Sequence, residues 1–289
     1  MKRALMFAGQ GAQHPGMGLE LYGKSPVAAR IFDQADSILG WSVSELCFRG
    51  TMEELTACAH CQPAIFVTSM AEYYASRDGL DSGDSFVAAG GLSLGELSAV
   101  TAAGVVDFET GLRMVARRGE LMDECCRRTE GAMAAIIGCD EAVLERVCRE
   151  HGVHVANYNC PGQRIISGEK SRVVEAAAAL APHSMKTQLL QVAGGFHSPL
   201  MQSASDAFGE YLRGIDFQEP GIRLVHNVSG TWTEDSGMSV KELLARQISS
   251  PVRWEECVVR LMEESDGLLE LGPGKVLSGL ARRIRPSRG

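Results

Sequence analysis

The feature that most constrains the fold of this chain is a Gly-Leu-Ser-Leu-Gly segment at residues 91–95. The preceding residues, 85–90, form an apolar run typical of a buried strand, and residues 96–103 have the pattern of a helix. At such a strand-to-helix turn the two glycines keep Cβ atoms out of a crowded backbone, and the serine is forced into a strained conformation with its hydroxyl exposed. The segment therefore predicts an α/β protein in which Ser93 is a nucleophile. The alternative is an ordinary glycine-rich turn.

Strand and helix patterns alternate along the chain, which favours an α/β fold with a mainly parallel sheet. In the outer parts, strands are predicted at 3–8, 85–90 and 268–271, and a helix from about 275. The middle predicts strands at 132–137, 153–158, 164–167 and 185–192, with helices at 140–151 and 169–181. This β-α-β-β-α-β order is that of a split, ferredoxin-like unit. We therefore expect a ferredoxin-like subdomain at residues 127–195, inserted into a larger domain formed by residues 1–126 and 196–289.

The composition is that of a globular protein and argues against binding to nucleic acid or membrane. Of 289 residues, 45% are hydrophobic and 22% are charged, and the net charge of −8 does not provide the basic surface that nucleic-acid binding requires. The apolar run that begins at Ala4 ends at Gly9, which is too short for an export signal, and no stretch approaches the roughly 20 apolar residues of a membrane span. Nine scattered cysteines do not form the pattern of a disulfide framework. We expect reduced thiols and a cytoplasmic location.

Two other motif matches are rejected because of their context. Cys58 and Cys61, with His60 between them, form half of a zinc site but lack a second pair at the usual spacing. Residues 18–25 match the phosphate-binding pattern G-x-x-x-x-G-K-S, but they do not follow a strand directly, and Glu20 would repel phosphate. We therefore expect neither a metal site nor a phosphate-binding loop.

A nucleophilic serine needs a base, and His197 is the candidate among seven histidines. It follows Gly194, Gly195 and Phe196 in a predicted loop, where the inserted subdomain would return to the main domain, and functional residues are concentrated in loops. No acidic residue in a telling motif completes a triad, so a Ser–His dyad is expected, with a backbone carbonyl orienting the imidazole. A histidine with a purely structural role is the alternative. At the turn itself, the backbone N–H of Leu94 would face a developing oxyanion.

Eight short segments are informative when taken together, although none of them is specific alone. They are FAGQGAQ at 7–13, GMG at 16–18, GLSLGE at 91–96, RRG at 117–119, NYNCPGQ at 157–163, GFHS at 195–198, SPVRW at 250–254 and LGPGKVL at 271–277. In this order they resemble the malonyl-CoA:acyl carrier protein transacylase family, which includes enzymes of fatty-acid synthesis and acyltransferases of polyketide synthases. The resemblance covers nearly the whole chain. It implies an α/β-hydrolase-like core that carries a ferredoxin-like subdomain.

The resemblance also implies a role for particular residues. Ser93 would accept the acyl group from the CoA thioester, and His197 would act as its general base and then protonate the leaving thiol. The backbone N–H groups of Gln10 and Leu94 would form the oxyanion hole. Arg118, which from the residues alone looks like one of several arginines on a solvated helix face, would hold the malonyl carboxylate as a planar, permanently charged fork.

Further residues would shape the substrate site. Gln247 would lie in its wall, carbonyl groups near Gln247 would orient His197, and Asn159 would contact the substrate. Phe196 is the bulky residue that, within polyketide acyltransferases, is associated with malonyl because it crowds the space that an α-methyl group needs. Leu92 departs from the family, which usually carries histidine at this position. The departure leaves the dyad intact and bears on acyl selectivity.

The function that follows is transfer of a malonyl group from CoA to the phosphopantetheine thiol of an acyl carrier protein, through a seryl ester and without a cofactor. A second possibility is an acyl hydrolase that clears stalled chains from carrier proteins, and Arg118 argues against it because such a hydrolase has little use for a carboxylate-binding residue. A third is a non-catalytic docking module, which the intact Ser93 and His197 disfavour.

An acidic carrier protein would need a local basic surface on a chain of net charge −8. The residues expected to contribute are Arg127, Arg128, Lys186, Arg282, Arg283 and Arg285. The alternative is that the C-terminal arginines are only a solvated tail. We expect the protein to be a monomer.

Overall fold

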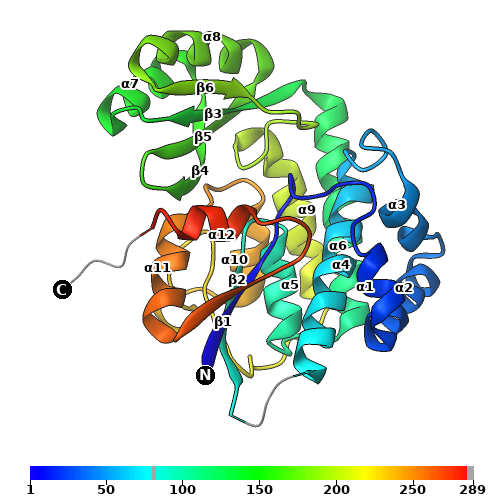
Figure 1. The fold of residues 1–289 in the computed structure, drawn as a ribbon. Coiled ribbons are helices and arrows are strands. Elements are labelled where there is room, and N and C mark those ends of the chain that lie inside the picture. Colours follow the sequence, from blue (N-terminus) through cyan, green and yellow to red (C-terminus); the bar gives the residue numbers. More distant parts are fainter. Residues whose placement is uncertain (80–82, 285–289) are drawn as a thin grey trace.

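The computed structural model describes residues 1–79 and 83–284, in which the strands form two sheets (Figure 1). The first sheet is parallel, in the order β7-β2-β1-β8. Its strands are β1 (Lys2–Phe7), β2 (Ser85–Gly91), β7 (Arg223–Leu224) and β8 (Gly267–Leu271). Alternate residues of β1 belong to different cores, Leu5 and Phe7 to one and Ala4 and Met6 to the other. Both faces of this sheet are therefore buried, which explains its continuous apolar runs.

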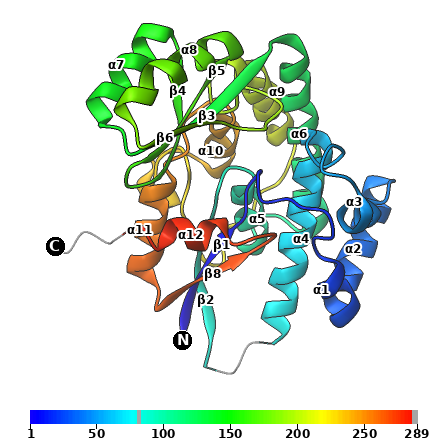
Figure 2. The ribbon, with the colours of Figure 1, turned by 45° about the horizontal axis from the view of Figure 1, so that its top comes forward.

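Helices cover both faces of the parallel sheet (Figure 2). On one face lie α4 (Cys58–Asp78) and α5 (Gly95–Ala102), with α6 (Phe108–Arg128) against them, and on the other lie α11 (Trp254–Glu264) and α12 (Val276–Ala281). The remaining helices of this part are α1 (Leu19–Lys24), α2 (Pro26–Leu39), α3 (Val43–Arg49), α9 (Gln202–Arg213) and α10 (Val240–Gln247), with short 3₁₀ turns at Pro199–Met201 and Thr233–Asp235. Side-chain caps mark several helix starts, as Asp107 does for α6 and Ser239 for α10.

The second sheet is antiparallel and lies above the parallel sheet in Figure 1, in green. Its elements are β3 (Gly131–Ile137), α7 (Glu141–His151), β4 (His154–Cys160), β5 (Gln163–Glu169), α8 (Lys170–Leu180), a 3₁₀ turn (Ala181–His183) and β6 (Lys186–Leu189). The strand order β4-β5-β3-β6 is that of the split β-α-β-β-α-β unit. The predicted fold class, a mainly parallel α/β core with a separate ferredoxin-like sheet, is confirmed. The division at residues 127 and 195 stays a prediction.

Three predicted strand ends in this sheet are wrong, and one of them is the end of β5, which lies at Glu169 and not at 167. The last strand, predicted to reach residue 192, ends at Leu189. The backbone N–H of Leu190 still donates to the carbonyl oxygen of Met133 at 2.9 Å, but Leu190 and Val192 line a cavity. The turn between β4 and β5 is shorter than predicted, because Cys160 still pairs with Gln163 and only two residues remain between the strands.

The structure shows where the two rejected motifs lie. Cys58 and Cys61 are buried in the first turn of α4, and His60 instead packs against Trp41, with ring centroids 5.6 Å apart. Residues 18–25 contain the six-residue helix α1, well beyond the end of β1. Among residues 1–79 and 83–284, no cluster of three or more metal-binding side chains occurs. No helix in the same ranges is long and apolar enough to cross a bilayer.

Candidate active site

The turn that carries Ser93 connects β2 to α5 and depends on both of its glycines. A Cβ atom on Gly91 would lie 2.0 Å from the carbonyl carbon of Gly95, and one on Gly95 would lie 2.1 Å from the carbonyl oxygen of Phe7. Ser93 itself has φ 51°, in the left-handed region that non-glycine residues rarely adopt. In the described part of the chain, only His197, with φ 56°, shares this property among non-glycine residues. Such conformations cluster at functional sites.

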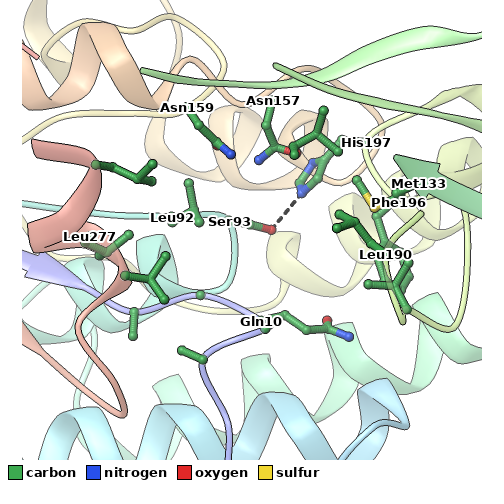
Figure 3. A pocket seen from close by; sticks show the side chains of 18 of the residues that line it. Gln10, Leu92, Ser93, Met133, Asn157, Asn159, Leu190, Phe196, His197 and Leu277 are labelled. Atoms are coloured by element: carbon green, nitrogen blue, oxygen red, sulfur yellow. Dashed lines mark hydrogen bonds between the residues drawn. The ribbon is translucent and has the colours of Figure 1, made fainter. Parts of the chain in front are cut away.

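Ser93 and His197 are in direct contact, although 104 residues separate them (Figure 3). The Oγ of Ser93 lies 2.8 Å from Nε2 of His197. The other ring nitrogen, Nδ1, lies 2.8 Å from the carbonyl oxygen of Gln247 and 3.2 Å from that of Ser250. Because carbonyl oxygens only accept hydrogen bonds, the proton is on Nδ1, and Nε2 is left to accept the hydroxyl proton of Ser93.

The surroundings of His197 keep its imidazole neutral. The side chain is buried, with 4% exposure. Burial first, and then the positive charge of Arg118, lower the pKa of His197 to about 4, against the opposing effect of the Gln247 and Ser250 carbonyl groups. At neutral pH the ring is therefore an unprotonated base in contact with a hydroxyl group.

Arg118 points inward from α6, whereas its neighbour Arg117 is partly exposed and pairs with Glu120. The Arg118 guanidinium donates to Oε1 of Gln62 at 2.8 Å, to Oε1 of Gln247 at 2.9 Å and to Oγ of Ser93 at 3.1 Å. These acceptors are uncharged, and no carboxylate in the described ranges lies within 4.0 Å of this guanidinium. Burial lowers the pKa of Arg118 to about 10, so the group is still charged at neutral pH.

A cavity of about 200 Å³ opens over Ser93 and His197 between the two sheets (Figure 3). Its walls are mainly apolar and come from α6, β3, β5, α12 and the loops around them. The apolar lining residues include Leu92, Met122, Met133, Ile165, Leu190, Val192, Phe196, Val276, Leu277 and Leu280. The polar lining residues besides the dyad are Gln10, Asn157, Asn159 and Gln163. The second sheet thus forms one wall of a site whose floor is the carboxyl end of the first.

The structure brings the predicted residues together, some of them in the lining of the cavity and others buried behind Ser93. Gln10, Leu92, Asn159 and Phe196 line the cavity, and their contact with a substrate stays a prediction. Gln247, which was expected in the wall, is fully buried and is not among the lining residues. It lies behind Ser93, where its side chain contacts Arg118 and its backbone contacts His197.

The oxyanion groups predicted from the sequence are located next to Ser93. Leu94 is the residue before α5, and Gln10 follows β1 in the loop that faces the turn. Within the described ranges, neither backbone N–H has a hydrogen-bond partner. Their role in an oxyanion hole stays a prediction, and neither donor is occupied by another group in these ranges. The side chain of Gln10 is turned away toward the thiol of Cys58, at 3.6 Å.

Four buried polar neighbours of the turn were not predicted from the sequence. Gln62, Glu96, His226 and Asn227 are all buried beside the turn. Glu96 is an acidic residue beside the turn, but it is not the acid of a catalytic triad. Its Oε1 lies 2.7 Å from Nδ1 of His226, and it does not contact His197. The one available signal was its place directly after the second glycine of the motif. The other three have none, because they stand in segments far from residue 93 in the chain.

This combination of fold and site defines a class, the α/β proteins with a Ser–His dyad at a strand-to-helix turn. Comparison with known proteins narrows it: the family described as "Acyl transferase domain" matches residues 5–277. The malonyl CoA-acyl carrier protein transacylase of Bacillus subtilis strain 168 is 41% identical, over 98% of this chain and 90% of that protein. A polyketide biosynthesis malonyl CoA-acyl carrier protein transacylase of the same organism is 37% identical, over 97% of this chain and 96% of its own length.

A solved structure supports the same assignment. It is described as a type II PKS acyl-carrier protein in complex with its malonyl-transacylase, and it aligns with a TM-score of 0.91 and 36% identity, over 98% of this chain and 93% of that one. The chain therefore belongs to the malonyl CoA-acyl carrier protein transacylase family. The family predicted from the sequence motifs is confirmed.

Proposed function

We propose that this protein transfers malonyl groups from CoA to the phosphopantetheine thiol of an acyl carrier protein, with Ser93 as the nucleophile. The observation that carries the proposal is the position of Arg118. A buried, charged guanidinium lies 3.1 Å from the Ser93 hydroxyl and has only uncharged partners in the described part of the chain. A carboxylated acyl group bound as an ester on Ser93 would place its negative charge next to this cation.

In the first half-reaction, Ser93 Oγ attacks the thioester carbonyl while Nε2 of His197 accepts the hydroxyl proton. The oxyanion that forms is stabilised by the backbone N–H groups of Gln10 and Leu94. When the carbon–sulfur bond breaks, the imidazolium returns the proton to the CoA sulfur, and a seryl ester remains. In the second half-reaction, His197 takes the proton of the incoming thiol, whose sulfur attacks the ester, and the proton then returns to Ser93.

The mainly apolar lining of the cavity supports transfer over hydrolysis. Transfer between two thiols needs an ester that survives until the second thiol arrives, and water must be kept from it. The substitution of leucine for the usual histidine at position 92 extends the apolar lining next to the nucleophile. An editing hydrolase on the same scaffold is not favoured, because neither Arg118 nor this lining serves such an activity.

Phe196 supports selection of malonyl over larger acyl groups. It is 5% exposed, lines the cavity and directly precedes His197, so its ring occupies space close to the bound acyl chain. An α-methyl substituent would have to share that space. Asn159 supports substrate contact in another way: it is 8% exposed and its Oδ1 has no partner in the described ranges, which leaves one acceptor for an amide group of the pantetheine arm.

The acyl carrier protein would approach the mouth of the cavity. Arg127 and Arg128 are exposed at the end of α6, and Lys186 at the start of β6. Arg282 and Arg283 are exposed after α12, on another side of the cavity, and Arg283 donates to the lining residue Gln163 at 2.9 Å. These positions support a basic docking surface for an acidic partner. Arg285, expected to belong to it, lies outside the described residues.

Two further expectations concern the cellular setting. All nine cysteines are free thiols, which supports a reducing compartment such as the cytoplasm. The protein is also proposed to be a monomer, and light scattering at several protein concentrations would test this.

The test is intact-protein mass spectrometry after incubation with malonyl-, methylmalonyl- or acetyl-CoA. A malonyl adduct is expected on the wild type and not on Ser93→Ala. An adduct that persists in Ser93→Ala contradicts the role of Ser93. Arg118→Gln should lose the preference for malonyl, whereas the matched variant Arg117→Gln, from the outer face of the same helix, should keep it. Adding holo acyl carrier protein then separates transfer from hydrolysis, because the adduct moves either to the carrier thiol or to water.

A further inference from the structure

Asn227 holds the backbone on both sides of the residue before the nucleophile. It lies in the loop that follows β7 and is fully buried. Its Oδ1 accepts a hydrogen bond from the backbone N–H of Ser93 at 2.7 Å, and its Nδ2 donates to the carbonyl oxygen of Gly91 at 2.8 Å. One side chain thus spans the turn across Leu92.

The amide of Asn227 has a single orientation that satisfies both contacts. The Gly91 carbonyl can only accept, and the Ser93 N–H can only donate, so the amide cannot be reversed without losing both hydrogen bonds. The loop that carries this side chain is itself fixed, because the backbone N–H of Asn227 donates to Oε2 of Glu96 at 3.2 Å. The same carboxylate oxygen accepts from Nε2 of Gln247 at 2.6 Å, and Nε2 also donates to the carbonyl oxygen of Ser93 at 2.8 Å.

Both backbone polar groups of Ser93 are therefore held by side chains, the N–H by Asn227 and the C=O by Gln247. This matters because Ser93 has φ 51°, a conformation that persists only where the surroundings impose it. If Ser93 relaxed to negative φ, its Cβ–Oγ bond would point in a different direction, and the 2.8 Å contact with His197 would be lost.

We propose that Asn227 is a positioning residue for the nucleophile: by holding the Ser93 N–H and the Gly91 carbonyl, it fixes the backbone conformation in which Ser93 Oγ meets His197. Asn227 does not line the cavity. The inference rests on the proposed function only in taking Ser93 as the group that becomes acylated. It adds a residue that acts on every acyl substrate alike, in contrast to Arg118.

Two substitutions separate this role from a merely structural one. Asn227→Leu has a similar shape but offers neither hydrogen bond. Asn227→Asp restores both when its carboxyl group is protonated, since the hydroxyl donates to Gly91 and the carbonyl accepts from Ser93. When ionised, it repels the Gly91 carbonyl. Titratable groups that face this position are Glu96 on α5, His226 beside it and Cys257 on α11, with Arg118 on α6 one side chain further away. The buried position beside Glu96 favours the protonated form at neutral pH.

The experiment measures the rate of seryl-ester formation by rapid quench and mass spectrometry, with malonyl- and acetyl-CoA, between pH 6 and 9. Asn227→Leu should be at least tenfold slower with both substrates, with KM changed less than twofold and the malonyl-to-acetyl ratio unchanged. Asn227→Asp should be slow at pH 9 and recover at least fivefold toward pH 6. Thr233→Val is the matched control: Thr233 contacts His226 at the far end of the same buried network, and this variant should react at the wild-type rate.

Several outcomes would overturn the inference. A folded Asn227→Leu that reacts at the wild-type rate removes Asn227 from positioning. A loss confined to malonyl-CoA shows an effect on Arg118 instead. Equal loss in both variants at every pH shows a structural role alone. If Asn227→Leu fails to fold, the pH dependence of Asn227→Asp, checked by near-UV circular dichroism, decides the matter. A wild type that is never acylated contradicts the proposed function itself, whereas an acylated wild type with unaffected variants contradicts only the role of Asn227.

Discussion

Acylation of Ser93 should persist to a pH far below the ordinary titration of histidine. Burial and the charge of Arg118 lower the pKa of His197 to about 4. Since the base must be unprotonated, the acid limb of kcat/KM, which reports the free enzyme, should fall near pH 4. At pH 5 about nine-tenths of the enzyme would keep a neutral base, whereas a histidine with a pKa of about 6.5 would leave only about 3%. The difference is about 30-fold in rate.

The same pKa predicts how stability depends on pH. The unfolded chain protonates this histidine near pH 6.5 and the folded chain only near pH 4, so between these values the unfolded state binds more protons. The contribution of His197 is fully present above pH 6.5 and is lost as the pH falls through this window. The cost reaches about 3 kcal/mol at pH 4. His197→Gln, which has no titrating ring, should show a correspondingly weaker loss of unfolding free energy.

The assay is rapid-quench mass spectrometry of the seryl ester after a pH jump that is short compared with unfolding. Acetyl-CoA serves as the uncharged reference substrate. With malonyl-CoA, the carboxylate offsets the charge of Arg118 in the complex, so the acid limb of kcat should lie at higher pH than that of kcat/KM; with acetyl-CoA the two limbs should coincide more closely. In Arg118→Gln the acid limb of kcat/KM should move to higher pH, because the charge that lowers the pKa of His197 is removed. An acid limb near pH 6.5 in the wild type, with the protein still folded, would refute the argument that burial and Arg118 control this base.

Three further predictions concern single side chains. Arg118→Gln should lower the malonyl-to-acetyl ratio of acylation rates by about 10- to 100-fold, because a charge-assisted hydrogen bond contributes about 1.5–3 kcal/mol; an unchanged ratio in a competition assay would count against it. Phe196→Ala should raise the methylmalonyl-to-malonyl ratio of acylation rates by about tenfold, which is the scale of one buried methyl group. An unchanged ratio would show that the Phe196 ring does not exclude the α-methyl group. Gly95→Ala should lower the unfolding free energy by about 3 kcal/mol, because its Cβ would lie 2.1 Å from the carbonyl oxygen of Phe7. Gly279→Ala, with no atom within 4 Å of the new Cβ, should be neutral or stabilising in the same denaturant titration.

The sequence predicts most of this fold because its strands are marked by apolar runs that end at turn residues. The first strand was expected at 3–8 and lies at Lys2–Phe7, and Asp140 caps α7 as its residue type indicates. The failure at β6 has a physical cause: Leu190 and Val192 continue the apolar pattern, but they face the cavity rather than a neighbouring strand. A periodic pattern reports burial, and it does not say which surface buries the side chain.

The site was predictable only where its residues stand in a motif. Ser93 and its two glycines are adjacent in the chain, so the sterics of the turn can be read from their order. Asn227, by contrast, reaches the turn from 134 residues away, and nothing in its neighbourhood marks it. The inward orientation of Arg118 depends on which face of α6 is buried, and three arginines within six residues give no indication of that from charge alone.

The charge of Arg118 bears on two properties of the site: the reactivity of the Ser93–His197 dyad and the binding of a carboxylated substrate. In the free enzyme its charge depresses the basicity of His197, and its guanidinium donates to the Ser93 oxygen at 3.1 Å, so the nucleophile is held in a less reactive state. In the proposed function, a malonyl carboxylate bound to Arg118 would offset this charge and compete for its hydrogen bonds. It would thereby strengthen the base at the same time as it fixes the acyl group. Acetyl-CoA brings no such charge and leaves the base weak. If Arg118 has the proposed role, selectivity for a carboxylated substrate would follow from activation of the dyad as well as from binding, and the separation of the kcat and kcat/KM limbs is the measurement that tests this.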